Sequence, residues 1–600
     1  MNDGRRYIVQ GLIFLVSLIF LIKLFFIQVL DSNYRLAAEN NIVQKIVEYP
    51  YRGLIYDRNG KLLVHNNPIY DLMVVPKEVE VSDTTDFCTF FNITKEDFEA
   101  KIAAAKRYSY IKPSRFIEKL SNLEFARLQD KLIKYKGFYV LARTVRSYPE
   151  NTLANALGYV GEINRRQLRR DTTDYYRQGD FIGISGIEKE YEEVLRGKRG
   201  VSYKMVNVRG IEKGAFKEGS YDTLSIPGDD LVSTIDSDLQ QYAEFLFQGK
   251  IGSVAAIEPS TGEILALVSG PSYNPNLLAG REFGDNFNML QSDTLKPLFD
   301  RPLMAMYPPG SMFKTVQALV ALQEGVVTPE EQIYSDGRLI GDLAPNGHYD
   351  VKKAIRLSSN NYFYKVFRRV INQNQDDNTY IDARIGLEKW RTYINNFGLG
   401  VRLPTDLPTV KSGYVPSIGY YDRMYGTNRW KFSNIYSLSI GQGEVLVTPL
   451  QMANLGATLA NRGYYYVPHI IKSIDENGSK RDIYTKQNWV GIDSTHYPVV
   501  IDGMEEVIQF GSGRRAFIKD IAICGKTSTV ENSQGADHSG FMGFAPKENP
   551  QIAIAVYVEN SGWGGRAAAS IASLLIEYYI RGEITRPWLE DFVLKGDFLY

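Results

Sequence analysis

Ser311 and Lys314 are the two residues whose types and spacing most directly favour chemistry. They stand in the segment YPPGSMFKTVQALV, where Pro and Gly interrupt the chain before an apolar run with helical spacing. Residues three apart on a helix share one face. A serine hydroxyl is a weak nucleophile that needs a base, and a lysine serves as one if burial lowers its pKa. Free amides at the helix N-terminus would also favour developing negative charge. The alternative is a surface helix with an unremarkable Ser and Lys, because Ser-x-x-Lys often arises by chance.

Two further segments carry polar groups that suit the same chemistry. The first, SSN at 358–360, begins a predicted helix and places Ser358 and Asn360 to project polar groups. Its simpler interpretation is a helix N-cap, a role that Ser and Asn favour. The second, KTST at 526–529, lies on a predicted strand and suits a carboxylate-binding edge. Its simpler interpretation is an exposed strand end.

Short apolar strands at the two ends of residues 236–585 must position these segments. The predicted strands are 253–257, 264–268, 521–530, 540–545 and 552–558. Helices are predicted at 238–247 and 567–580, and residues 311–460 form a largely helical insert between the halves of the sheet. This order predicts an α+β fold, in which an antiparallel sheet carries helices on its faces.

The N-terminal segment at 7–30, YIVQGLIFLVSLIFLIKLFFIQVL, is long and apolar enough to cross a bilayer as a helix. Arg5 and Arg6 precede it, which predicts that residues 1–6 are cytoplasmic. No small-x-small cleavage site follows at once, so we expect an uncleaved signal-anchor with the rest of the chain outside the cytoplasm. The alternative is a cleaved signal peptide. Lys23 would snorkel to the outer interface or face a partner helix.

Residues 31–235 show no cluster of a nucleophile, a base and an acid. Their predicted role is to act as a spacer and to make contacts rather than to carry out chemistry. Residues 52–64 indicate a β-hairpin around an Asn-Gly turn. Residues 95–137 have a charged helical pattern, and residues 186–197 indicate a helix closed by Gly197.

The composition limits partners and cofactors. Lys+Arg and Asp+Glu both number 69, so no global charge attracts the chain to nucleic acid. The five histidines are scattered without metal-ligand spacing. Cys88 and Cys524 fall in different predicted domains, so a disulfide between them is not expected. A chain of 600 residues predicts two or more folded units.

In their order along the chain, Ser-x-x-Lys, Ser-x-Asn and Lys-Thr-small resemble the motifs of the penicilloyl-serine transferases. The segments EPSTGEILALV, PSYNPN, YPPGSMFK, GQGE, TPLQM and HSGFMGFAP resemble a class B penicillin-binding protein. RGLIYDRNG, RSYP, LGYVGEI and GIEKEYEEVLRG resemble the N-terminal pedestal of that class. The likeness is greatest to elongation-type members.

This resemblance implies a specific domain order. A transmembrane signal-anchor at 7–30 follows the cytoplasmic residues 1–6. An elongated mixed α/β pedestal of the dimerisation type spans 31–235. A penicillin-binding transpeptidase domain spans 236–585, with a five-stranded antiparallel sheet, flanking helices and a helical subdomain, and residues 586–600 form a C-terminal tail.

The resemblance also implies a serine-type peptidoglycan D,D-transpeptidase or carboxypeptidase, active in cell-wall elongation and cell shape and inhibited by β-lactams. Ser311 would attack the carbonyl between the two D-alanines of a stem peptide, while Lys314 takes its proton. Ser358 would relay a proton to the leaving amine, with Lys526 tuning it electrostatically. Asn360 would hold the amide backbone of the substrate.

Further roles follow from the same resemblance. The backbone amides of Ser311 and Thr529 would form the oxyanion hole, and Thr527 and Ser528 would lie near the terminal carboxylate of the substrate. Family members usually have Gly in place of Ser528, so β-lactam affinity is expected to differ while function survives. Some elongation-type relatives carry Cys and His in the loop before Ser-x-Asn. Here that loop keeps only His348, so neither a metal nor another cofactor is predicted.

The implied partners are peptidoglycan stem peptides, β-lactam antibiotics, a SEDS-family glycan polymerase of the RodA type and other membrane proteins of the elongation complex, but no nucleic acid. The anchor helix and the pedestal near residues 52–60 would contact the polymerase. The implied location is the inner (cytoplasmic) membrane, with a single pass and most of the chain on the periplasmic side. The alternatives are a division-type transpeptidase, a β-lactam-sensing receptor, a β-lactamase and a catalytically idle scaffold.

Overall fold

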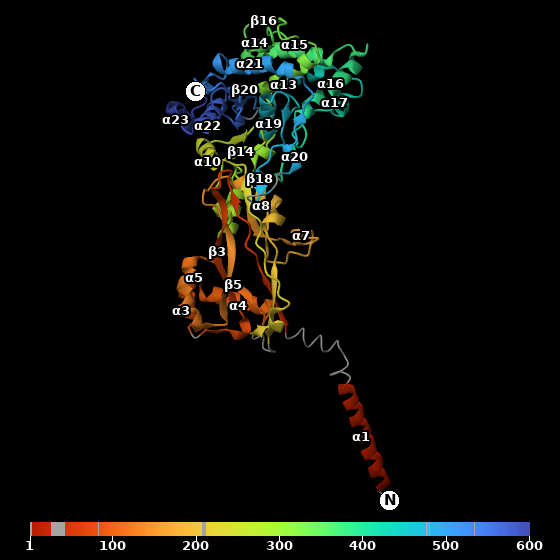
Figure 1. Ribbon diagram of the computed structural model, residues 1–600, viewed down its shortest axis with the longest axis vertical. Helices are drawn as coiled ribbons and strands as arrows, with labels where there is room; N and C mark the ends of the chain where they lie inside the picture. The colour runs from red at the N-terminus through yellow and green to blue at the C-terminus, as the bar shows by residue number, and fades with distance from the viewer. Residues whose placement is uncertain are drawn as a thin grey trace. The chain divides into compact units, whose positions relative to one another are not determined.

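The structure is a computed structural model that describes residues 3–25, 43–81, 83–206, 212–475, 478, 481–532 and 535–599. Figure 1 shows the order of its elements along the chain. The chain divides into two compact units. The smaller comprises Met1–Gly53, Ile69–Arg143 and Arg196–Gly228, and the larger comprises Leu54–Pro68, Thr144–Leu195 and Asp229–Tyr600. All the residues that the sequence assigns to chemistry lie in the larger unit.

A five-stranded antiparallel sheet lies at the centre of the larger unit, as predicted. Its strand order is β14 (Ile264–Gly270), β13 (Gly252–Ile257), β22 (Ile552–Val558), β21 (His538–Ala545) and β20 (Cys524–Val530). The register places Lys526 opposite Met542. Strand β20 begins later than predicted, since Ile521 forms an isolated bridge with Ile518 instead. The sheet joins strands from both ends of the segment, so residues 271–523 form an insertion.

Helices cover the sheet, and its central strand β22 is therefore buried along its whole length. Helix α19 (Pro449–Ala460) packs with Gly456 against Met542 and Ala553 of the sheet. A side chain at Gly456 would meet atoms of the sheet at 3.3–3.5 Å, so glycine permits this close packing. Helices α10 (Ser237–Leu246) and α22 (Ala568–Arg581) contact each other and pack on strands β14 and β22 (Figure 1). The predicted α+β fold is confirmed.

The insertion is largely helical, as predicted. Its elements include α11 (Phe283–Ser292), α12 (Arg301–Met304), η6 (Gly310–Phe313), α13 (Lys314–Gln323), α14 (Val351–Leu357), α15 (Asn360–Ile371), α16 (Thr379–Asn396), α17 (Ile418–Tyr425), α18 (Phe432–Ile435), η7 (Tyr436–Ile440), α20 (Asp482–Thr485) and α21 (Tyr497–Gln509). Strand β15 (Ile333–Ser335) pairs with β16 (Gly347–Tyr349), and β17 (Tyr464–Tyr465) with β19 (Asn488–Trp489). Phe367 of α15 packs edge-on against Trp390 of α16, with ring centroids 5.5 Å apart. This packing supports the helices that carry the site.

The hairpin predicted at 52–64 is confirmed and belongs largely to the larger unit. Strand β2 (Ile55–Tyr56) pairs with β3 (Leu62–Val74) and with β12 (Leu231–Ser233), and β12 pairs with β18 (Ile471–Ile474). The carboxylate of Asp57 is buried and accepts from two amides of the turn. Arg58 forms ion pairs with Glu258 and Glu263 at 2.7 and 3.2 Å. The hairpin is thus packed on the segment predicted to be the transpeptidase domain.

The helix predicted at 186–197 consists of two short helices. Helix α8 (Gly186–Glu190) and helix α9 (Glu192–Leu195) meet at Tyr191, whose hydroxyl donates to Asp406 at 2.9 Å. Gly197 follows with a φ of +67°. This left-handed conformation favours glycine and ends the helical segment.

The smaller unit has an aromatic core of its own. Phe87, Phe98, Phe116 and Phe138 all pack on one another, with ring centroids 4.9–6.4 Å apart. Its elements include helices α3 (Thr84–Phe91), α4 (Lys95–Tyr108) and α5 (Asn122–Gln129), and strands β1 (Val43–Glu48), β5 (Ser114–Leu120), β10 (Gly200–Val206) and β11 (Glu212–Ala215). The helical pattern at 95–137 holds for α4 and α5, whereas residues 114–120 between them form a strand because they pair with β3.

Helix α1 (Asp3–Phe25) covers most of the predicted transmembrane segment. Within the described part of the chain, its stretch Ile8–Phe25 is the one that is long and apolar enough to cross a membrane. Lys23 lies in the last turn of this helix. Residues 26–30 of the predicted segment lie outside the described residues.

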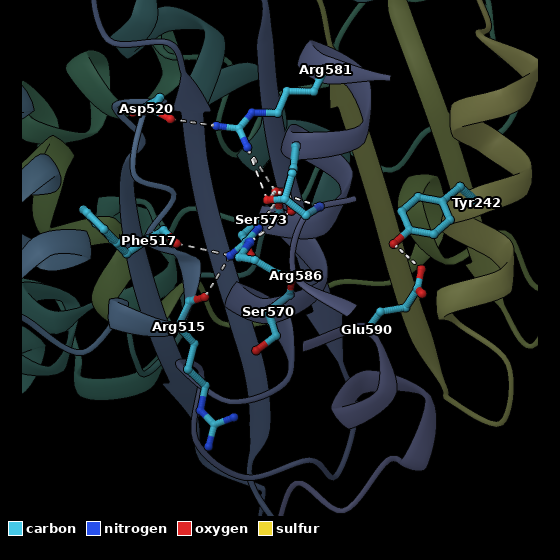
Figure 2. A network of polar contacts seen from close by, with 11 residues as sticks. Tyr242, Arg515, Phe517, Asp520, Ser570, Ser573, Arg581, Arg586 and Glu590 are labelled. Carbon is cyan, nitrogen blue, oxygen red and sulfur yellow. Dashed lines mark hydrogen bonds and ion pairs between the residues drawn. The ribbon is translucent and has the colours of Figure 1, made fainter. Parts of the chain in front are cut away.

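Residues 586–600 were predicted to be a tail, but they contain helix α23 (Pro587–Lys595). Its apolar residues Leu589 and Val593 are one helical turn apart and buried. Figure 2 shows polar contacts in this region, including the hydroxyl of Tyr242, which donates to Glu590 at 2.7 Å. The guanidinium of Arg586 donates to three main-chain carbonyls, those of Arg515, Phe517 and Ser573, at 3.3, 3.3 and 3.1 Å.

Glu577 of helix α22 is the anionic partner of Arg586, and replacing it with Gln is expected to destabilise the larger unit. Its side chain is fully buried, with Oε2 3.0 Å from Nε of Arg586. Removing one partner of a buried pair costs about 3–5 kcal/mol. Thermal unfolding should show a clear loss for Glu577→Gln. The control Glu590→Gln weakens one hydrogen bond and should cost only about 1 kcal/mol. Equal unfolding midpoints for the two variants would contradict this reading of the network.

Candidate active site

Ser311 lies in the 3₁₀ turn η6, immediately before helix α13. The preceding residue, Gly310, has a φ of +54° and donates its N–H to the carbonyl of Gly441 at 2.9 Å. A side chain at Gly310 would lie 2.2 Å from Oγ of Ser528. Glycine is therefore required twice, by the backbone conformation and by the approach of strand β20. The predicted neighbours Ser311 and Lys314 occupy this turn and the first residue of α13.

Lys314 is fully buried, and its amine is surrounded by polar groups of the Ser-x-Asn motif. Its Nζ lies 2.6 Å from the carbonyl oxygen of Ser358, 3.2 Å from Oγ of Ser358 and 2.6 Å from Oδ1 of Asn360. Burial and the positive charge of Lys526 hold the pKa of Lys314 well below its ordinary range. A lowered pKa increases the fraction of this amine that is unprotonated and able to accept a proton.

The Ser-x-Asn motif spans the junction between helices α14 and α15. Ser358 ends α14 in a left-handed conformation, with a φ of 57°. Ser359 is the N-cap of α15, and its Oγ accepts from the N–H of Tyr362 at 3.2 Å. The simpler N-cap interpretation thus holds for the middle residue, while Ser358 and Asn360 on either side face Lys314.

Lys526 of strand β20 completes a chain of polar groups. Its Nζ donates to Oγ of Ser358 at 2.9 Å, so one hydroxyl lies between two lysines. Burial lowers the pKa of Lys526 to about 7. A hydroxyl between two amines of lowered pKa can pass a proton from one amine to the other.

The rest of the Lys-Thr-Ser-Thr segment alternates between the two faces of β20. Ser528 points to the same side as Lys526, and its Oγ accepts the N–H of Ser311 at 3.2 Å. Thr527 points to the opposite side and contacts Oγ of Ser512 at 2.5 Å. On that side, Oγ1 of Thr529 accepts from the N–H of Gly564 at 3.3 Å. The resemblance implies that Thr527 and Ser528 both lie near the substrate carboxylate, but their side chains point to opposite faces of β20.

The sequence did not single out several residues that shape this site. Asp342 accepts from the hydroxyl of Ser359 at 2.7 Å, and Ser512 contacts Thr527. Glu559 accepts from the hydroxyl of Tyr307, in the segment before Ser311, at 2.7 Å. None lies in the Ser-x-x-Lys, Ser-x-Asn or Lys-Thr-small segment, and a Gly-Asp pair in a loop was the only signal for Asp342.

The absence of a metal remains a prediction. In the described residues, no group of three or more His, Cys, Asp or Glu is placed to hold a metal ion. The carboxylate of Asp342 is engaged by hydrogen bonds from Ser359 and Asn361.

Comparison with known families identifies the family of this chain. A model described as "Penicillin binding protein transpeptidase domain" matches residues 252–577, more than half of the chain. The chain belongs to the penicillin-binding protein transpeptidase family. A second model, "Penicillin-binding Protein dimerisation domain", matches residues 47–233 of this penicillin-binding protein.

Its relatives give the subtype. The chain is 31% identical over 616 residues to "Peptidoglycan D,D-transpeptidase MrdA" of Acinetobacter baumannii, covering 96% of this chain and 87% of the relative. It is 28% identical over 624 residues to MrdA of Escherichia coli K12, covering 96% and 94%. The solved structure of a penicillin-binding protein 2 from Helicobacter pylori aligns with a TM-score of 0.75 and 25% identity over 90% of this chain and 100% of that one. This penicillin-binding protein is an elongation-type class B member, in a family of serine acyl-transfer enzymes, as the sequence predicted.

Proposed function

We propose that this class B penicillin-binding protein cross-links peptidoglycan stem peptides with Ser311 as the nucleophile and Lys314 as the general base. The environment of Lys314 carries the proposal. Its amine is fully buried, its pKa is well below the ordinary range, and it contacts a hydroxyl that Lys526 also contacts. Such an amine takes a proton from a nearby serine during attack on a carbonyl.

Acylation proceeds by attack of Oγ of Ser311 on the carbonyl carbon between the two D-alanines. The proton of Ser311 moves to Nζ of Lys314. The C–N bond then breaks, and the leaving D-alanine amine receives a proton through the hydroxyl of Ser358, with Lys526 behind it. The N–H groups of Ser311 and Thr529 stabilise the oxyanion, and such donors contribute about 3 kcal/mol each. Asn360 orients the substrate backbone.

The acyl-enzyme is then attacked by an amine of a neighbouring stem peptide, which forms the cross-link and releases Ser311. A penicillin acylates Ser311 but leaves slowly. The test is to label the full-length protein with fluorescent penicillin and to chase with unlabelled drug, beside an assay of D-alanine release. A stable adduct and release of D-alanine are expected. Rapid release of hydrolysed drug would identify a β-lactamase instead.

Replacing Ser528 with Gly is expected to accelerate acylation. The hydroxyl of Ser528 accepts the N–H of Ser311, one of the two proposed oxyanion donors, so the substrate carbonyl must displace it. A hydrogen bond of this kind contributes about 1 kcal/mol, which corresponds to an increase of about fivefold in the acylation rate constant for penicillin. Stopped-flow or quenched labelling measures this constant.

Ser528→Ala is the matched control for backbone flexibility, because it removes the hydroxyl and keeps Cβ. Both variants should acylate faster than the wild type. A rate constant unchanged or lowered in Ser528→Ala would show that the hydroxyl does not compete with the substrate.

The protein is further proposed to act at the inner membrane, with helix α1 as a single-pass anchor and residues 31–235 and 236–585 as the pedestal and transpeptidase domains. The Helicobacter pylori penicillin-binding protein 2 was solved in a complex with MreC, which supports partners from the elongation complex. A glycan polymerase of the SEDS family (RodA type) is the proposed partner of α1. The side chains of Asp57 and Arg58 are engaged within the larger unit, so they favour α1 over residues 52–60 as the contact.

Exchanging α1 for an unrelated transmembrane helix is expected to reduce co-purification with the polymerase. Penicillin labelling of the exchanged protein should remain, because the site lies in the larger unit. Undiminished co-purification would exclude α1 as the contact.

A further inference from the structure

The β15–β16 loop, residues 336–346, is tied to the Ser-x-Asn motif by a carboxylate. Oδ2 of Asp342 accepts from the hydroxyl of Ser359 at 2.7 Å and from the backbone N–H of Asn361 at 2.8 Å. Ser359 and Asn361 are both fully buried. Hydrogen bonds to an ionised acceptor are stronger than neutral ones. This carboxylate therefore fastens the loop to the first turn of helix α15.

Other contacts reinforce the same connection. The side-chain N–H of Asn360 donates to the carbonyl of Gly341 at 2.7 Å. Its Oδ1 accepts from Nζ of Lys314 at 2.6 Å, so one amide bridges the loop and the proposed base. With its own amide oriented to satisfy both donors, Asn361 accepts from the N–H groups of Gly337 and Arg338 at 3.0 and 3.2 Å.

The motif needs support of this kind because its backbone is strained. Ser358 occupies the left-handed region, which costs about 1 kcal/mol or more for a residue with a side chain. Such a conformation persists only where neighbouring contacts hold it. Asp342 holds Ser359 and Asn361, which lie just after Ser358. The hydroxyl of Ser358 is thereby kept between Lys314 and Lys526.

The same carboxylate also acts on the proposed base through its charge. Among the described residues, two charged groups act on Lys314, namely Lys526 from strand β20 and Asp342 from the β15–β16 loop. Burial and Lys526 lower the pKa of Lys314, whereas the negative charge of Asp342 raises it. Asp342 of this loop thus opposes part of the lowering of the Lys314 pKa by Lys526.

We infer that Asp342 is a positioning residue of the transpeptidase site. Its hydrogen bonds hold the Ser-x-Asn motif in place, and its negative charge opposes part of the effect of Lys526 on Lys314. This inference rests on the proposed function, in which Lys314 accepts the proton of Ser311. It assigns two separable effects to one carboxylate, and two substitutions separate them.

The first substitution, Asp342→Asn, removes the charge and retains an oxygen that accepts from Asn361 or Ser359. The acylation rate constant for fluorescent penicillin is measured against pH in the full-length protein. Because a base works only when unprotonated, the rate falls at the acid side as Lys314 takes up a proton. Loss of the negative charge lowers the pKa of Lys314, so the acid limb should move to lower pH.

The second substitution, Ser359→Ala, removes the hydrogen bond to Asp342 together with the N-cap hydrogen bond from Tyr362, and it leaves the charge. Its plateau rate should fall about 10- to 100-fold through misplacement of the motif, with the acid limb unmoved. The matched control is Asp336→Asn, which makes the same charge change in the same loop. Asp336 pairs locally with Arg338 at 3.7 Å and is not among the groups that act on Lys314, so its profile should match the wild type.

Thermal unfolding of each variant confirms that it is folded before its profile is used. An Asp342→Asn profile that coincides with the wild type would overturn the role of the charge, and an unchanged plateau in Ser359→Ala would overturn the role of the hydrogen bonds. Failure of the proposed function is a different outcome, in which Ser311→Ala still forms the adduct.

Discussion

Replacing Ser311 with alanine is expected to abolish the covalent penicillin adduct. The hydroxyl of Ser311 is the atom proposed to form the ester, and alanine offers no nucleophile in its place. The fold should be preserved, since the backbone turn is set by Gly310 and its hydrogen bond to Gly441. Fluorescent penicillin labelling measures the loss, and mass spectrometry of the wild-type adduct should place the added mass on the peptide that contains Ser311.

Ser260→Ala is the matched control for this experiment. Ser260 lies in the turn between β13 and β14. Within the described part of the chain, its hydroxyl donates a hydrogen bond to Glu258. Labelling of this variant should equal that of the wild type. An adduct that survives in Ser311→Ala would mean that another residue is the nucleophile, and the proposed mechanism would then be wrong.

Replacing Lys314 with methionine is expected to lower the acylation rate constant by about 100- to 10,000-fold, the range of general-base contributions. Methionine has a similar length and no charge, and the site is fully buried. Thermal stability should fall by about 1–3 kcal/mol, because acceptors of Ser358 and Asn360 lose a donor, while the domain stays folded. Stopped-flow acylation and thermal unfolding measure the two effects separately.

The pH dependence of acylation should differ between the wild type and Lys314→Met. Burial lowers the pKa of Lys314, so the wild-type acylation rate should fall as acid protonates the amine. Lys314→Met should lack this acid limb. Lys353→Met, which removes an exposed amine near His348, is the control and should retain both the rate and the limb. A limb that persists in Lys314→Met would assign the titration to another group.

The sequence by itself determined most of the elements around the proposed catalytic residues, and it predicted those residues from their types and spacing. The apolar runs at 253–257, 264–268 and 552–558 predicted three strands of the sheet, because short apolar runs bounded by turns form buried strands. The spacing of Ser311 and Lys314 predicted that the two residues share one helical turn, since residues three apart on a helix lie on one face. Helix α23 was not predicted, because its few apolar residues form a buried face only where they pack on other parts of the fold.

Only the tertiary structure decided how the three motifs meet. Ser528 contacts Ser311 across 217 residues of sequence, and Lys526 contacts Ser358 across 168. Asp342, which no motif marks, engages Ser359 because the β15–β16 loop returns over the start of helix α15. Local patterns fix the direction of a side chain relative to its own helix or strand. Which distant group it then meets depends on the packing of whole elements, and that packing is set by the shared core rather than by any one segment.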